Sequence, residues 1–199
     1  LEPLLAAQKL GATICPWDIC SDPDGLLDAV GPIDGLVHNA GLYQHASCGQ
    51  WTEEDWYQTW RTNTMAPALL SQAFARRLSG PGAIVAIAST LAVRPALGTA
   101  AYAASKAALV ALVKSLALEL APSRIRVNAV SPGVIPTDMT VVPRGGRTEA
   151  EQRADFAALH PLGRMGTADE VAQTVLLGLG NPWMTGVNLV IDGGLLNRE

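Results

Sequence analysis

The sequence has little cysteine, no excess of positive charge and no long unbroken run of apolar residues. Cys15, Cys20 and Cys48 are the only three cysteines in 199 residues. They form no disulfide framework, which favours a reducing compartment and predicts a cytoplasmic protein. A formal net charge of −4 offers no basic surface to nucleic acid or to an anionic membrane. Because Lys114 and Glu119 interrupt the most apolar stretch, we expect no membrane span, which needs roughly 18 apolar residues.

Metal-binding patterns are missing as well. Cys15 and Cys20 flank Asp18, and His45 precedes Cys48, but neither spacing matches a zinc motif and no second pair completes four ligands. We therefore expect no metal site. Hydrophobic residues make up 49% of the chain and charged residues 16%, which indicates one globular domain over residues 1–199.

Short apolar runs alternate with helical stretches along the chain. The pattern predicts strands at residues 12–18, 34–39, 83–88, 125–130 and 187–191, and helices at 52–78, 100–120, 148–159 and 167–179. Capping boxes mark three helix starts, Thr52 with Asp55, Thr148 with Glu151 and Thr167 with Glu170. Apolar strands that alternate with helices favour an α/β fold with a doubly wound parallel sheet, covered by helices on both faces in three layers. Residues 134–166 are expected to form a lid over a substrate site.

A tyrosine and a lysine stand one helical turn apart in the alanine-rich stretch 100–120. Residues i and i+4 share a helix face, so the Lys106 ammonium can approach the Tyr102 phenol. A phenol titrates near ~10, and a nearby positive charge favours the phenolate. Such a pair can exchange a proton with an alcohol or a carbonyl oxygen, which Ser89 could also hold at the end of a strand. Taken alone, the spacing is better explained by a core tyrosine beside a surface lysine, because such pairs are common.

Together with its neighbours, the pair resembles the short-chain dehydrogenase/reductase family. The matching residues are Asp18-Ile19, His38-Asn39-Ala40-Gly41, Asn63, Ser89, Tyr102 with Lys106, Asn128, Pro132-Gly133 with Thr137, and Asp192-Gly193-Gly194. They extend over nearly the whole chain, which makes the resemblance far more specific than any single motif. It implies a single-domain Rossmann-like fold. It also implies an NAD(P)-dependent oxidoreductase that interconverts a secondary alcohol and a ketone, either similar to 3-oxoacyl reductases or similar to dihydrodiol and alcohol dehydrogenases.

The resemblance also implies the site residues and their roles. In the catalytic set, Tyr102 would exchange the proton and Ser89 would orient the substrate oxygen. Lys106 would lower the tyrosine pKa and hold the nicotinamide ribose, and Asn63 would help a water to connect Lys106 with solvent. Besides Tyr102 and Lys106, the NAD or NADP contacts would be Asp18, Ile19, Asn39, Ala40, Gly41, Pro132, Gly133, Ile135 and Thr137. His38 replaces an asparagine that is common in the family.

A proline follows the expected catalytic asparagine by four residues. Pro67 has no N–H to donate to the carbonyl of Asn63. We therefore expect that carbonyl to be left free for the relay water, and the helix to kink there. An ordinary proline kink without a functional role is the alternative.

The most recognisable motif of the family is absent from the sequence. This is the glycine-rich turn that places the dinucleotide pyrophosphate at a helix N-terminus. The following strand, whose end selects NAD or NADP, is missing too, so the sequence predicts either cofactor without a preference. Residues 1–11 correspond to the tail of the next helix. Without the N-terminal βαβ unit two strand edges would be unpaired, so we expect the natural protein to be longer.

The apolar surfaces and the lid predict partners of different kinds. The helices at 52–78 and 100–120 are expected to pair in a homodimer or homotetramer. Four aromatic residues are expected in the core or at that contact rather than in a binding platform, namely Trp51, Trp56, Tyr57 and Trp60. Three lid arginines either form a solvated face or meet an acidic group of a substrate or carrier, namely Arg144, Arg147 and Arg153. Residues 90–93 are small or apolar, which favours an apolar substrate.

Two other functions stay compatible with the resemblance. A dehalogenase-like lyase uses a related Ser-Tyr pair with arginine in the lysine position, and Lys106 argues against it. A non-catalytic relative would be expected to lack part of the catalytic set, which is complete in this sequence.

Overall fold

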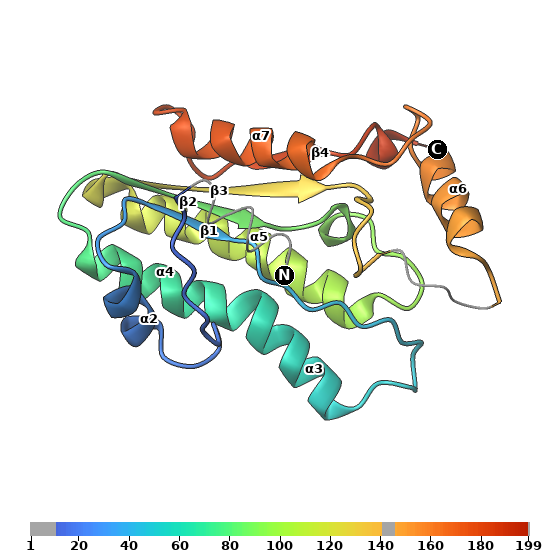
Figure 1. Cartoon of the computed structure of the whole chain (residues 1–199), viewed down its shortest axis with the longest axis horizontal. Coiled ribbons are helices and arrows are strands. Elements are labelled where there is room, and N and C mark those ends of the chain that lie inside the picture. The colour runs from blue at the N-terminus through green and yellow to red at the C-terminus, as the bar shows by residue number, and fades with distance from the viewer. Residues whose placement is uncertain (1–10, 141–145, 199) are drawn as a thin grey trace.

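A four-stranded parallel sheet lies at the centre of this computed structural model, which describes residues 11–140 and 146–198 (Figure 1). The strands are β1 (Gly35–His38), β2 (Gly82–Ile87), β3 (Ile125–Pro132) and β4 (Asn188–Ile191), paired in the order β1-β2-β3-β4. In register, Val85 of β2 lies between Val37 of β1 and Asn128 of β3. Because all four strands run in one direction, the residues that follow them meet at a single edge of the sheet.

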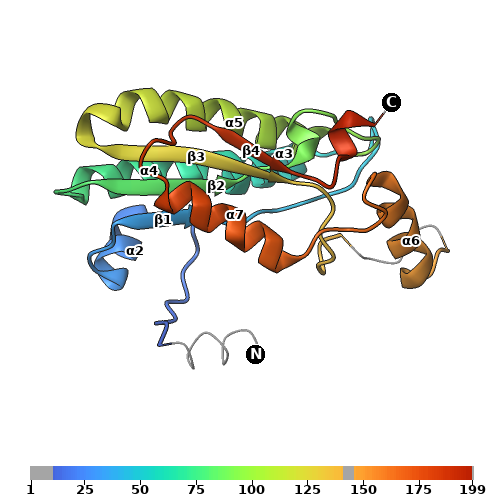
Figure 2. The same ribbon diagram turned by 90° about the horizontal axis from the view of Figure 1, so that it is seen from above.

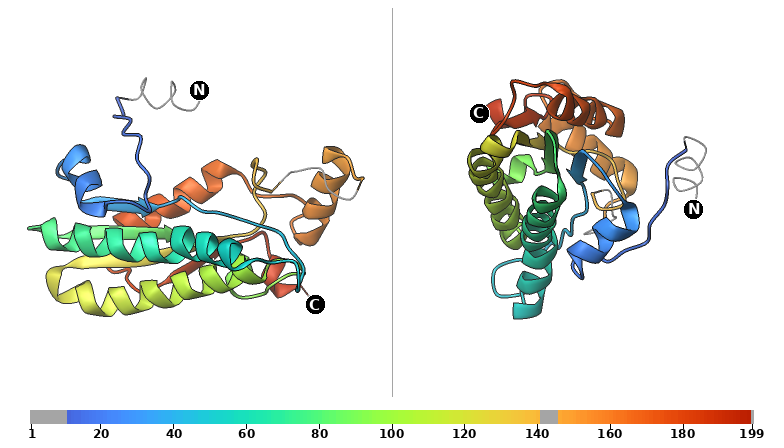
Figure 3. Two further views of the ribbon diagram at one scale, coloured as in Figure 1. Left: turned by 90° about the horizontal axis from the view of Figure 1, so that it is seen from below. Right: turned by 90° about the vertical axis from the view of Figure 1, so that its left-hand side faces the viewer.

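Helices cover both faces of the sheet, as the doubly wound pattern predicts. α4 (Ala66–Arg77) and α5 (Ala100–Leu120) lie on one face and α7 (Ala168–Gly180) lies on the other (Figures 1 and 2). α3 (Glu53–Trp60) leads through the π-helical turn η1 (Arg61–Met65) into α4, and α2 (Pro23–Val30) packs against α4. The end-on view in Figure 3 shows the three layers. α6 (Glu149–Leu159) lies beyond the carboxyl ends of the strands (Figure 1).

The core lies between the sheet and the α4–α5 layer. Its largest fully buried side chains include Phe74 of α4, Leu109 of α5, and Ile84 and Ile125 of the strands. On the opposite face α7 approaches β2 closely at Gly178, where an added Cβ would lie 3.0 Å from the Val85 side chain. Burial of apolar side chains therefore holds the helices to the faces of the sheet. The edge at which the strands end is not part of this core and can carry a functional site.

The helix starts follow the signals in the sequence. All three predicted capping boxes are present, each with the threonine hydroxyl accepting a backbone N–H and the acidic side chain returning to the threonine N–H. The stretch predicted as one helix at 52–78 is divided into α3, η1 and α4. α2 was not predicted, although its signals are local: Asp22 is the N-cap and Pro23 occupies the first helical position.

The strand predicted at residues 12–18 is wrong. These residues are irregular and lead into a turn in which the Ser21 N–H donates to the Asp18 carbonyl (Figure 2). A strand forms only beside a hydrogen-bonded neighbour, and no strand within residues 11–140 and 146–198 pairs with this segment. The helical tail expected at residues 1–11 lies outside the described residues except for Gly11.

α5 is more apolar than the sequence led us to expect. With the following 3₁₀ turn η3 (Ala121–Ser123) it spans Ala100–Ser123 and has the length and hydropathy of a membrane-crossing helix, despite Lys114 and Glu119. It packs against β3 and contributes Leu109 and Val113 to the core, which is the packing of a core helix.

Candidate active site

Two hydroxyl groups meet where β2 ends and α5 begins. Ser89 follows β2 and is the N-cap of the 3₁₀ turn η2 (Thr90–Ala92), where its Oγ accepts the N–H of Leu91 at 3.1 Å. Tyr102 lies in the first turn of α5, and its phenol interacts with the Ser89 side chain. The ring of Tyr102 packs edge-on against Tyr43, with the ring centres 5.0 Å apart. The structure thus brings the predicted Ser89 and Tyr102 together.

Lys106 lies one helical turn further along α5 and is 3% exposed. Its Nζ donates to the carbonyl of Ile87 at 2.7 Å and lies 5.7 Å from the centre of the Tyr102 ring. Burial lowers the pKa of Lys106 to about 8. Burial also raises the pKa of Tyr102, and the hydrogen bond from Ser89 only partly opposes it. The expected lowering of the tyrosine pKa by Lys106 therefore does not dominate in this structure, because the ammonium is directed at Ile87.

Asn63 is fully buried in the π-helical turn η1, and its side-chain amide is occupied by the protein itself. Oδ1 accepts the N–H of Leu42 at 2.8 Å, while Nδ2 donates to the Leu42 carbonyl at 2.9 Å and to Ser105 Oγ at 3.0 Å. The amide therefore clamps the loop after β1 to α5, so any part in a proton relay would fall to the Asn63 main chain.

The helix around Asn63 is interrupted, although the interruption is a π-turn and not a simple kink. The N–H of Ala66 donates to the carbonyl of Arg61, five residues earlier, and Pro67 supplies no N–H. This arrangement removes the regular donor to the Asn63 carbonyl. That the carbonyl holds a relay water stays a prediction.

His38, which replaces the family's asparagine, is accommodated by a partner in another layer. Its Nε2 lies 2.8 Å from Ser71 Oγ of α4, and the ring is buried. Burial, with the positive charge of Lys106 adding to it, lowers the pKa of His38 to about 4. At neutral pH a neutral imidazole therefore connects β1 to α4.

The residues expected to contact NAD(P) lie in three separate segments. Asn39, Ala40 and Gly41 follow β1, and an added Cβ on Gly41 would lie 3.5 Å from both Lys106 Nζ and Asn63 Oδ1. Pro132 ends β3, and Gly133, Ile135 and Thr137 follow it. Asp18 and Ile19 form a turn in which the Asp18 carboxylate accepts the N–H of Cys20 at 2.9 Å. Arg61 ties that turn to η1 by donating to the Cys20 carbonyl.

A buried histidine that the sequence did not single out supports the segment after β3. His160 ends α6 and is 3% exposed. Its Nε2 accepts the N–H of Val134 at 3.1 Å, and its Nδ1 donates to the Phe156 carbonyl at 2.7 Å. Because one partner is a donor and the other an acceptor, the ring must be the neutral tautomer with its proton on Nδ1. The approach is close: an added Cβ on Gly133 would lie 2.8 Å from Nε2.

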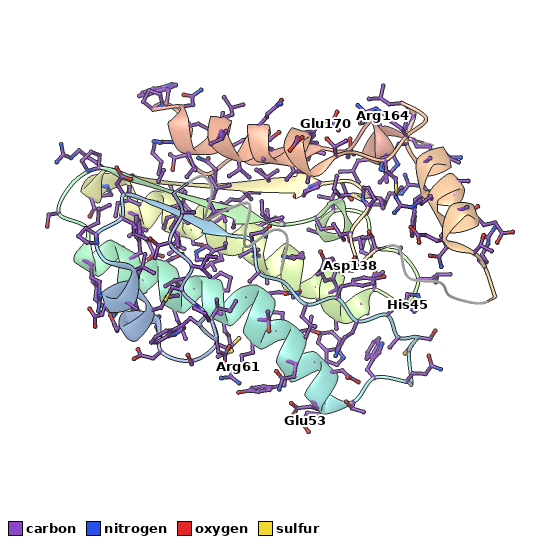
Figure 4. All side chains as sticks on the ribbon, in the orientation of Figure 1. His45, Glu53, Arg61, Asp138, Arg164 and Glu170 are labelled. Atoms are coloured by element: carbon purple, nitrogen blue, oxygen red, sulfur yellow. The ribbon has the colours of Figure 1, made fainter. Side chains whose placement is uncertain are left out.

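A cavity of about 720 Å³ opens in front of the Tyr102 and Ser89 hydroxyls. Leu91, Val134 and Met139 line it, and α6 contributes Phe156 and Leu159 from the region predicted as a lid. His45 also lines the cavity, and Figure 4 places it at the end of the molecule where α6 lies. A cavity of this size, largely apolar with two hydroxyls at one wall, suits a small organic substrate.

Two of the three lid arginines are engaged elsewhere. Arg147 pairs with Asp155 at 2.5 Å and Arg153 with Glu149 at 2.8 Å, whereas Arg144 lies outside the described residues. At the start of α7, Arg164 likewise pairs with Glu170 (Figure 4).

Metal ligands and exposed aromatic rings offer no second site. In the described part of the chain no group of three or more His, Cys, Asp or Glu side chains is placed to hold a metal ion, and the three cysteines are free thiols. Trp51 and Trp56 pack against each other at a ring distance of 5.3 Å, while Tyr57 and Trp60 are partly exposed on α3.

Comparisons with known proteins agree with this geometry. Residues 6–196 match the family model described as enoyl-(acyl carrier protein) reductase. Carbonyl reductase family member 4 of Danio rerio is 42% identical over 166 residues, which cover 83% of this chain and 67% of that protein. The 3-oxoacyl-[acyl-carrier-protein] reductase of Rattus norvegicus is 35% identical over 179 residues, covering 89% of this chain and 72% of the relative.

Solved structures show the same architecture. A short chain dehydrogenase family protein from Francisella tularensis is 27% identical with a TM-score of 0.87, covering 94% of this chain and 82% of that one. A gluconate 5-dehydrogenase from Burkholderia cenocepacia, in complex with NADP and tartrate, is 28% identical with a TM-score of 0.81, covering 91% of this chain and 71% of that one.

Proposed function

The chain belongs to the short-chain dehydrogenase/reductase family, and from this premise we propose how its own residues carry the reaction. It is an NAD(P)-dependent oxidoreductase that acts on CH–OH groups and interconverts an alcohol and a ketone. The observation that carries the proposal is the Ser89–Tyr102 pair at the wall of the cavity, with Lys106 buried beside it.

The residues present fit the nicotinamide end of NAD(P). The Lys106 ammonium lies beside Gly41, and Gly133 lines the cavity next to the Ser89 and Tyr102 hydroxyls. Lys106 would hold the ribose hydroxyls, Gly133 with Ile135 and Thr137 the carboxamide, and the turn at Asp18 the adenine. When bound, the cofactor supplies or accepts the hydride.

Tyr102 moves the proton in this reaction. During reduction its phenol donates a proton to the oxygen that was the substrate carbonyl, while the Ser89 hydroxyl holds that oxygen. Because burial raises the pKa of Tyr102, the phenol is protonated at neutral pH and ready to donate. Oxidation of an alcohol needs the phenolate, so its rate should rise with pH. Lys106 stabilises the phenolate left after donation, and the Asn63 main chain connects Lys106 with solvent through a water.

Ketone reduction is accordingly the direction we assign at neutral pH. The relatives with carbonyl reductase, 3-oxoacyl-[acyl-carrier-protein] reductase and L-xylulose reductase names support this direction. A buried lysine beside the tyrosine favours this chemistry over that of a dehalogenase-like lyase.

We also propose that the protein is a cytoplasmic homodimer or homotetramer. Apolar side chains are exposed on α3, η1, α4 and α5, among them Tyr57, Met65, Leu69 and Leu118. Figure 3 shows that these helices form one layer of the molecule. Burying this surface against a second copy would remove it from water. Light scattering on the purified protein measures the assembly directly, and a monomer at micromolar concentration would contradict the proposal.

Substitution of Tyr102 by phenylalanine tests the catalytic assignment. Tyr102→Phe removes the proton donor and keeps the ring, so turnover followed by nicotinamide absorbance should fall by about 10²- to 10⁴-fold. NAD(P)H binding, followed by fluorescence titration, should change little. Tyr57→Phe, on the exposed face of α3, is the matched control. Turnover retained in Tyr102→Phe would show that another group moves the proton.

A further inference from the structure

We propose that the cavity binds a substrate that carries a carboxylate, and that Arg94 and Arg198 hold this group; the inference rests on the proposed reduction at Tyr102. Both arginines line the cavity that contains the Ser89 and Tyr102 hydroxyls. They are the only permanently charged side chains in its wall among the described residues, and no aspartate or glutamate lines it there. In a chain with a net charge of −4, a cavity wall whose charged side chains in the described residues are both positive favours an anion.

The hydrogen bonds of the two guanidinium groups leave most of their donors available. Arg94 Nη1 donates to the Arg198 carbonyl at 2.9 Å and to the Leu195 carbonyl at 3.5 Å. Arg198 Nη1 donates to the Ala158 carbonyl of α6 at 2.7 Å. Each guanidinium has five N–H donors in a planar fork, so the other nitrogens of both remain for a ligand.

Most of the other arginines in the described residues are paired with a carboxylate, whereas Arg61 and Arg126 donate to main-chain carbonyls away from this cavity. Five of them form ion pairs with aspartate or glutamate: Arg76, Arg77, Arg147, Arg153 and Arg164. Within residues 11–140 and 146–198, neither Arg94 nor Arg198 forms such a pair. Two guanidinium groups without a carboxylate, beside a substrate cavity, are suited to take one from the substrate.

Hydrogen bonds hold the segments that carry the two arginines next to each other. Arg94 lies five residues after Ser89, on the segment that follows η2. Its bonds to the carbonyls of Leu195 and Arg198 hold the C-terminal turn η4 (Leu195–Asn197) and its following residue next to it. A substrate whose carbonyl is at Ser89 and Tyr102 can therefore direct an acidic end to this pair of arginines.

The apolar part of the cavity wall indicates which kind of substrate carries the carboxylate. Leu91, Val134 and Leu159 line the same cavity and are suited to contact a short carbon chain. We therefore assign the substrate to the oxo acids, reduced to hydroxy acids: the carbonyl carbon gains the hydride and its oxygen gains the Tyr102 proton. The apolar substrate favoured by residues 90–93 corresponds to the middle of such a molecule.

A purely structural role of Arg94 is the competing explanation, because its side chain fastens the C-terminal turn. Arg198→Gln separates the two roles. It removes the second cation and keeps the Arg198 carbonyl that Arg94 binds. Arg153→Gln is the matched control, since Arg153 lies on α6 in an ion pair and does not line the cavity.

The first experiment compares reduction of levulinate with that of its methyl ester by the full chain. We expect kcat/KM to favour the acid by about 10-fold or more, as for a charge-assisted hydrogen-bonded pair. Arg198→Gln should reduce this preference by raising the KM for the acid more than the KM for the ester. Arg94→Gln should reduce the preference as well. Equal kcat/KM for acid and ester, or a preference that survives both substitutions, would overturn the inference.

Calorimetric titration of succinate and of its diamide gives a readout that needs no turnover. Succinate should bind, its affinity should fall by about 10-fold in Arg198→Gln and stay constant in Arg153→Gln, and the diamide should not bind measurably. Equal affinity for both compounds would contradict the acid site. A chain that reduces neither ketone and still binds succinate through both arginines would contradict the proposed reduction and support the acid site.

Discussion

Replacing the buried lysine of the site should make the protein more stable while removing its activity. Lys106 is 3% exposed, and burial lowers its pKa from an ordinary 10.5 to about 8. This difference in pKa means that the charged form of Lys106 destabilises the folded state by about 3 kcal/mol. Methionine has a similar length and no charge, and it gives up the bond to the Ile87 carbonyl, which is worth about 1 kcal/mol. Lys106→Met should therefore raise the free energy of unfolding by about 2 kcal/mol at about pH 7.

The pH dependence has a definite sign. Below about pH 8 the lysine is protonated in both states, so the folded state carries the full cost. Between about pH 8 and 10.5 the folded state has released the proton and the unfolded state still binds it, so stability rises with pH. In the parent protein this gain should reach about 2 kcal/mol by about pH 9.5. It should be absent in Lys106→Met, so the gap between the two proteins should close.

Urea unfolding from about pH 7 to about pH 9.5 measures both effects. The upper limit avoids ionisation of Tyr102, whose pKa burial raises. Lys114→Met, at an exposed position of the same helix, is the control and should change stability little at either pH. A Lys106→Met protein that is less stable than the parent at about pH 7, with a gap that is the same at both pH values, would refute the reasoning.

Three further predictions follow from single contacts. His160→Ala leaves the Val134 N–H without its acceptor, so it should lower the free energy of unfolding by about 1–3 kcal/mol and raise the KM for NAD(P)H. His160→Gln should restore both the stability and the KM. An unchanged KM in the alanine variant would contradict the positioning role. The pKa of His38 is lowered to about 4, so its neutral form stabilises the fold above about pH 6.5. The free energy of unfolding should fall by about 3 kcal/mol as the pH is lowered from about 6.5 to about 4. His38→Asn should not show this fall when it is unfolded in urea over the same pH range. Gly98 has φ +73°, and an added Cβ there would meet the His45 ring. Gly98→Ala should therefore lower the free energy of unfolding by at least about 1 kcal/mol and alter the cavity. A thermal unfolding midpoint equal to that of the parent protein would contradict this prediction.

Local sequence patterns account for most of the helices and strands. Four of the five predicted strands are present as β1 to β4, because short apolar runs bury their side chains wherever the sheet forms. The capping boxes were predictable because a threonine and an acidic residue three positions later meet within one turn. The strand predicted at residues 12–18 is absent because a strand needs a hydrogen-bonded neighbouring strand. A local sequence pattern does not show whether such a neighbour is available.

The candidate site also has features that the sequence predicts and features that depend on the fold. The spacing of Tyr102 and Lys106 places both on one helix face, and the family resemblance indicates Ser89 and Asn63 beside them. The direction of each polar group depended on the fold. Lys106 donates to Ile87 on β2, and the Asn63 amide binds the loop after β1. Burial then sets the pKa values of Lys106 and Tyr102, which no spacing along the chain reveals.

The sequence by itself determined the alternation of strands and helices, the places where helices begin, and the residue types that can move a proton. Only the tertiary structure decided which distant groups meet. Val134 and His160 are 26 positions apart, and Arg94 and Arg198 are 104 positions apart. Contacts at such separations depend on the path of the chain between them and on loop closure, whereas a capping box or an i, i+4 pair is set by the geometry of one helical turn. For this reason the shared helix face of Tyr102 and Lys106 could be predicted from the sequence. The histidine that supports the loop after β3 and the arginines proposed to bind the acid could not.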